Sequence, residues 1–86
     1  MTMTKAEQTK LYETTDLALV SVLLLFLPDS LEAVNRENPH RVVFGFEKSV
    51  KLDELVSRFW SRKLKIEPRA FFDGIKIAKA RIYSEN

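Results

Sequence analysis

Cysteine is absent from this 86-residue chain, which excludes disulfides, thiolate metal sites and a cysteine nucleophile. Its absence fits a reducing compartment, so we expect a cytoplasmic protein. The one histidine, His40, adjoins a predicted turn and has no identifiable partner for a metal site or for general base catalysis. No Gly-rich phosphate loop occurs, and no serine lies in a nucleophile-elbow context. We therefore expect no enzyme activity, no metal and no cofactor.

Long hydrophobic runs are also lacking, apart from the stretch LALVSVLLLFL at residues 17–27. Eleven residues are too few to cross a bilayer, which needs about 20. A signal peptide is disfavoured because Glu13 and Asp16 precede the run and no small-residue cleavage pattern follows it. We expect a buried helix here and no membrane partner.

Glycine and proline are scarce, at two and three residues, so helices should dominate and loops should be short. Apolar residues make up 45% of the chain and charged residues 30%, values that are typical of globular domains. The length predicts one domain with a modest core. We divide the chain into a flexible polar tail at residues 1–11 and a single α+β domain at residues 12–86.

The first helix is expected to follow an N-cap at Thr14 or Thr15, with Asp16 in its first turn, and to end near Leu27, before Pro28. Its Val-Ser-Val centre is also compatible with a buried strand, but length and capping favour a helix. A β-hairpin should follow, with strands at residues 31–36 and 41–47 joined by a turn that contains Asn38-Pro39. On its second strand Val42, Phe44 and Phe46 should face the core.

Two more helices complete the predicted order αββαα. The first is capped by Ser49 and runs from about Val50 to Leu64, and Glu67-Pro68 separates it from a last helix that ends near Tyr83. An isolated two-stranded hairpin is only marginally stable in water. A helix that is apolar on nearly every side must be packed against other elements on nearly every side. The hairpin must therefore pack on the helices or pair at its edge with another chain. A second copy of the chain is also one way to cover the first helix, so we expect a homo-oligomer.

Charge is unevenly spread along the chain. Residues 1–48 hold five basic against seven acidic residues, whereas residues 49–86 hold nine against five. Such a basic half indicates an anionic partner or, equally simply, a solvated helix surface. A helical projection places two aromatic residues and three cations within about 80° of arc on the last helix, at 100° per residue. These residues are Arg69, Phe72, Lys76, Lys79 and Tyr83.

Exposed aromatic side chains can stack on bases, and cations supply the phosphate contacts of nucleic-acid binding. A second basic row, formed by Arg58, Arg62 and Lys65, should add phosphate contacts. In the alternative interpretation, Phe72 packs against the preceding helix while the lysines only solvate the surface. Glu54, four residues before Arg58, predicts a weak ion pair on the helix.

Four segments, taken in order, resemble a family of small prokaryotic and phage-borne domains of unknown function. They are YETTDLALVSVLL at residues 12–24, RENPHRVVFGFE at 36–47, LVSRFW at 55–60 and FFDGIKIAKARIY at 71–83. The resemblance implies a compact αββαα unit in short stand-alone proteins, often near mobile or viral genes, and it implies no catalytic residues. Its members commonly have a Lys-Gly pair after the first helix, where this chain has Phe26-Leu27-Pro28.

The sequence thus predicts a small non-enzymatic protein, of a phage or mobile-element accessory type, that binds DNA or RNA with weak sequence specificity. The alternative is a protein–protein interaction module, which acts on a host protein or is a structural homo-oligomer. Ala70 and Ile77, on the side of the last helix away from the basic sector, favour this alternative.

Overall fold

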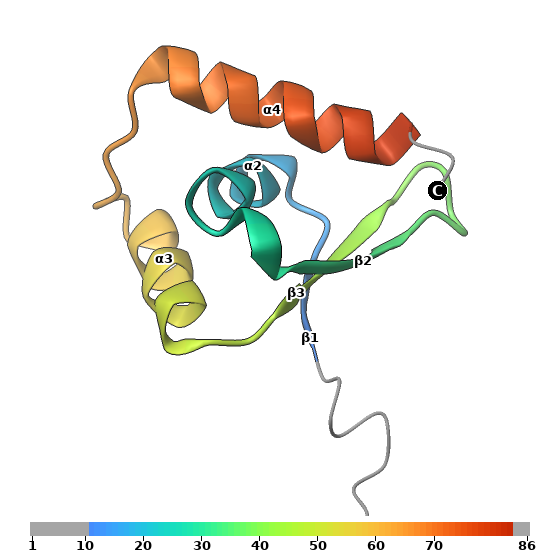
Figure 1. Ribbon diagram of the computed structural model, residues 1–86, viewed down its shortest axis with the longest axis horizontal. Helices are drawn as coiled ribbons and strands as arrows, with labels where there is room; N and C mark the ends of the chain where they lie inside the picture. The colour runs from blue at the N-terminus through green and yellow to red at the C-terminus, as the bar shows by residue number, and fades with distance from the viewer. Residues whose placement is uncertain (1–10, 84–86) are drawn as a thin grey trace, which may run out of the picture.

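The computed structural model describes residues 11–83, which form an α+β domain with a three-stranded antiparallel sheet (Figure 1). The chain runs through β1 (Leu11–Thr14), α2 (Leu17–Phe26), a 3₁₀ turn η1 (Pro28–Ser30), β2 (Leu31–Asn35), β3 (Val43–Glu47), α3 (Val50–Trp60) and α4 (Pro68–Tyr83). The predicted helix, hairpin, helix, helix order is confirmed, with one added strand at the start. Residues 1–10 of the predicted tail lie outside the described residues.

β1 is the strand that the sequence analysis missed. The tail was predicted to include Leu11, which instead begins β1 and pairs with Glu47 of β3. The strand order is β1-β3-β2, so this chain itself supplies a third strand to the hairpin. The hairpin therefore has a third strand from its own chain, on the free side of β3, and its completion by a second chain stays a prediction.

α2 lies at the centre of the domain, between the sheet and α4, with α3 beside it (Figure 1). Six consecutive residues, 19–24, are buried, as its apolar composition requires. Cover comes from Phe44 and Phe46 of β3, Leu52 of α3 and Ala78 of α4. The sheet and the two later helices therefore supply cover for this helix within one chain, and the homo-oligomer stays a prediction.

Local interactions explain where α2 begins. Asp16, not Thr14 or Thr15, is the N-cap: its carboxylate accepts hydrogen bonds from the backbone N–H groups of Ala18 and Leu19, at 2.9 and 3.2 Å. Thr14 Oγ1 in turn accepts from the backbone N–H of Asp16. The hydroxyl of Ser21, buried in mid-helix, donates to the carbonyl of Leu17 at 2.8 Å, so the helix keeps this polar group satisfied.

α3 is capped by Ser49 as predicted, but it ends at Trp60 rather than Leu64. Arg62 has a φ of 63°, the left-handed conformation that usually falls to glycine. The backbone N–H of Arg62 donates to Phe59 O and that of Lys63 to Arg58 O, the paired bonds of a Schellman motif. This turn ends the helix four residues early and sends residues 61–67 across to α4.

Candidate nucleic-acid interface

α4 is anchored on α2 by small residues, and this fixes which of its faces points outward. Gly74 is buried so closely that an added Cβ would lie 2.9 Å from the backbone oxygen of Ser21 and 3.0 Å from Leu25 Cγ. Ala78, one turn further on, is completely buried. Because these two residues face α2, the side chains on the opposite arc of α4 point into solvent.

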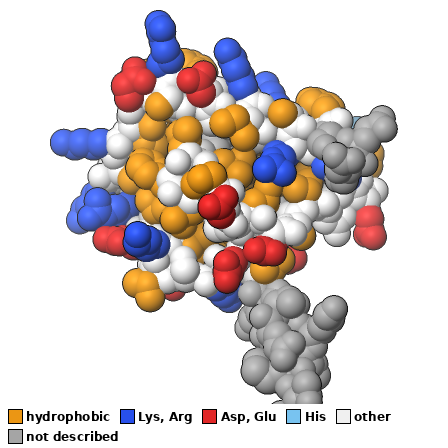
Figure 2. All heavy atoms as spheres, in the orientation of Figure 1, with side chains coloured by type: hydrophobic (Ala, Val, Ile, Leu, Met, Phe, Trp, Pro, Cys, Tyr) orange, Lys and Arg blue, Asp and Glu red, His pale blue; other side chains and the backbone are white. Residues whose placement is uncertain are grey.

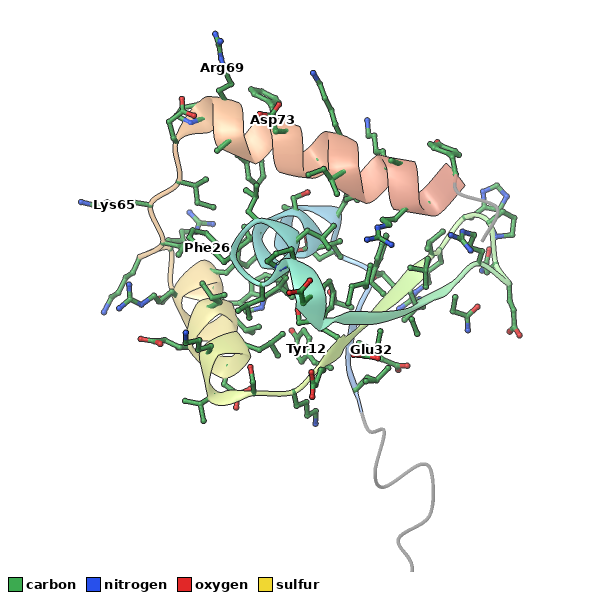
Figure 3. The ribbon with its side chains drawn as sticks, in the orientation of Figure 1. Tyr12, Phe26, Glu32, Lys65, Arg69 and Asp73 are labelled. Carbon is green, nitrogen blue, oxygen red and sulfur yellow. The ribbon has the colours of Figure 1, made fainter. Side chains whose placement is uncertain are left out.

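That outward arc holds all five residues that the projection selected: Arg69, Phe72, Lys76, Lys79 and Tyr83, here called the basic-aromatic face. All five are exposed. The exposed fractions of Phe72 and Tyr83 are 63% and 80%, so most of each side chain is open to solvent. Figure 2 shows blue side chains projecting along the edge of the molecule formed by α4, and Figure 3 shows Arg69 pointing away from the body of the domain.

The cations of the basic-aromatic face form no ion pair with another described residue, so they remain available to bind an anion. Among residues 11–83 one ion pair occurs, between Arg58 and Glu54 of α3 at 3.6 Å, as the spacing on α3 predicted. Asp73, which the sequence analysis did not weigh, is exposed next to Phe72 and lies at the margin of the face. The three cations less this one carboxylate leave a local charge of +2.

The second basic row lies outside the basic-aromatic face, on α3 and on the connection between α3 and α4. Lys65 belongs to the connection between α3 and α4, and Figure 3 shows it pointing in a different direction from Arg69. Arg58 and Lys65 instead share an open groove of about 540 Å³ with Lys63, Phe26, Glu54, Leu55 and Leu64. Arg62 is exposed but does not line this groove. The predicted set is therefore split into two basic surfaces.

Residues distant in sequence extend the other end of α4. Tyr83 lines a second open groove, of about 440 Å³, together with His40 and Arg41 of the hairpin turn. The guanidinium of Arg36 holds this end of the helix: its Nε donates to Ile82 O at 2.9 Å and its Nη2 to Arg81 O at 2.6 Å. A cation at a helix C-terminus satisfies carbonyls that have no partner within the helix. None of these contacts is visible in a local sequence pattern, because about 45 residues separate the partners.

Residues 11–83 contain no cluster of three or more histidine, aspartate or glutamate side chains that could hold a metal ion. No helix of the described chain is both long and apolar enough to cross a bilayer.

Comparison with known proteins gives no family for this chain: no family model, no curated protein and no solved structure matches it. The resemblance to small phage-borne domains stays a prediction.

Proposed function

We propose that this protein is a non-enzymatic nucleic-acid-binding module that holds single strands on the basic-aromatic face of α4. The observation that supports the proposal is the exposure of Phe72 and Tyr83 in the same sector as Arg69, Lys76 and Lys79. Burying an aromatic ring on folding is favourable, so two exposed rings beside three cations form a surface suited to an aromatic, anionic polymer.

Single strands fit this face better than duplex because an aromatic side chain can stack only on a base that is unpaired and accessible. Phe72 and Tyr83 are eleven residues apart, which corresponds to about 16 Å along the helix axis at 1.5 Å per residue. The two rings would therefore contact bases that are not neighbours in the strand, with Lys76 and Lys79 meeting the phosphates between them. Stacking has little sequence preference, which agrees with a weakly sequence-specific, accessory role in a phage or mobile element.

The dependence of affinity on salt concentration tests the proposal, and its slope gives the number of phosphate contacts. For single strands the logarithm of affinity falls with the logarithm of salt concentration with a slope of about −0.7 per phosphate contact. Three contacts on α4 give a slope near −2, and engagement of Arg58, Arg62 and Lys65 as well gives a slope near −4. The measurement is fluorescence anisotropy of a labelled single strand and of the matching duplex.

A matched pair of variants separates a local site from the general charge of the protein. Lys76→Glu with Lys79→Glu should abolish binding at low salt, because it reverses the charge of the basic-aromatic face. Lys48→Glu with Lys51→Glu makes the same change in net charge at exposed positions off α4, and it should weaken binding only slightly. Equal losses of single-strand affinity in the two double variants would contradict the proposal. So would the absence of binding by the native protein at low salt.

A protein-interaction module is the second candidate, and exposed apolar side chains favour it. Trp60 is 59% exposed at the end of α3, with its ring 5.0 Å from that of Phe59, and Ile77 is 46% exposed on α4. Retention of a host protein after nuclease treatment, lost on Trp60→Ala or Ile77→Asp, would support this candidate in place of the first.

A further inference from the structure

The sheet has a second face that none of the described helices covers. The side chains of Phe44 and Phe46 point toward α2, so alternation along the strands turns their neighbours the other way. Figure 1 shows α2 and α4 on one side of the sheet. The opposite side, here called the outer sheet face, is formed by Leu11, Glu13, Ala33, Asn35, Val43 and Glu47. Glu32, at the irregularity in β2, projects from the same side (Figure 3).

The outer sheet face combines an apolar centre with acidic residues around it. The side chain of Leu11, which pairs with Glu47, covers Gly45: an added Cβ at Gly45 would lie 2.7 Å from Leu11 Cδ1. Val43, toward the other end of β3, is half-buried. Glu13, Glu32 and Glu47 are all exposed, and none of them forms an ion pair with another residue of the described chain. This face is therefore chemically the reverse of the basic-aromatic face, which has an apolar pair flanked by cations.

We propose that the outer sheet face docks α4 of a second copy of this chain. Two outer sheet faces would not pair with each other, because each would set three carboxylates against three carboxylates. A basic helix laid on the face instead matches carboxylates with Lys76 and Lys79, and it places Phe72 against Leu11.

The two surfaces lie on opposite sides of one molecule, so they cannot meet within a chain. Figure 3 shows Arg69 projecting from α4 on one side and Glu32 projecting from β2 on the side away from α4. Contact between unlike surfaces of successive copies is head to tail, and it builds rings or open chains rather than a two-fold symmetric dimer. Nucleic acid on the basic-aromatic face would compete with this contact, but docking itself does not depend on the proposed nucleic-acid function.

The contact is expected to be weak. Three strands at about 4.8 Å spacing and five residues at about 3.4 Å rise give a face of only about 240 Å². A stable complex buries roughly 800 Å² on each partner. Association should therefore require high protein concentration and low salt, since exposed charges are largely screened beyond about 10 Å at 0.1 M salt.

Charge reversal on the two surfaces, followed by mixing, tests the docking. Glu13→Lys with Glu47→Lys makes both surfaces basic, whereas Lys76→Glu with Lys79→Glu makes both acidic. Each double variant alone should stay monomeric in sedimentation velocity on nuclease-treated protein, under low-salt conditions in which the native chain associates. An equimolar mixture of the two should associate as the native chain does, because every contact again joins opposite charges.

Three results would overturn the proposal: a native chain that is monomeric at low salt, a reversed variant that associates alone, or a mixture that stays monomeric. If circular dichroism shows that a reversed variant is unfolded, Glu13→Gln with Glu47→Gln replaces it and should weaken native association at least tenfold. The same Gln variant should bind single strands as the native chain does, so failure of docking and failure of nucleic-acid binding can be told apart.

Discussion

Gly74→Ala tests the orientation of α4, on which both proposals depend because each uses the basic-aromatic face. In an exposed helix position, alanine in place of glycine stabilises by about 1 kcal/mol. At Gly74 the new methyl group would lie 2.9 Å from a backbone oxygen of α2, which cannot move aside as a flexible side chain can. Overpacking of this kind costs about 1–3 kcal/mol, so the clash exceeds the helix preference.

We expect Gly74→Ala to lower the free energy of unfolding by about 1 kcal/mol, measured by urea denaturation with an unchanged m-value. Ala80→Gly is the control: Ala80 is exposed on α4, and glycine there should cost about 1 kcal/mol through helix preference alone. An increase in stability of about 1 kcal/mol for Gly74→Ala would refute the reasoning. It would place Gly74 in solvent and turn Phe72 and Tyr83 toward α2.

Two further substitutions test the ends of the helices. Arg36→Met should lower the free energy of unfolding by about 1–2 kcal/mol, because it removes two hydrogen bonds from a charged donor to the last carbonyls of α4. Arg41→Met, at an exposed turn position, should change it by less than about 0.5 kcal/mol, and equal effects would argue against the cap. Arg62→Gly should raise the free energy of unfolding by about 1 kcal/mol, because glycine adopts the left-handed conformation without strain. Lys63→Gly gives no such gain, and a loss of stability in Arg62→Gly would show that the turn is not strained.

Local patterns were sufficient to predict most of the elements. The apolar run at residues 17–27, the Ser49 cap and the break at Pro68 each act over one or two turns, and the structure has the corresponding helices. The end of α3 was misplaced because Arg62 adopts a conformation that sequence normally signals with glycine. The N-cap was misplaced by one or two residues for a simpler reason, since Thr14, Thr15 and Asp16 are all good capping residues.

Features that depend on distant contacts could not be predicted. Four residues at Leu11–Thr14 carry too little pattern to indicate a strand, and β1 exists because it pairs with residues of β3 that are 30 to 36 positions away. The helical projection did find the outward arc of α4, since periodicity alone separates its apolar side from its charged side. It could not show that Lys65 and Arg69 point in different directions, because that depends on the path of residues 61–67 between two helices.

The central claim is that α4 binds single strands by stacking, and Phe72→Ala with Tyr83→Ala tests it most directly. Both side chains are exposed, so their loss should leave the free energy of unfolding nearly unchanged. At roughly 1–3 kcal/mol per stacked base, the double variant should bind a single strand at least about 30-fold more weakly than the native protein, with the salt slope preserved. Unchanged single-strand affinity in a folded double variant would contradict the account.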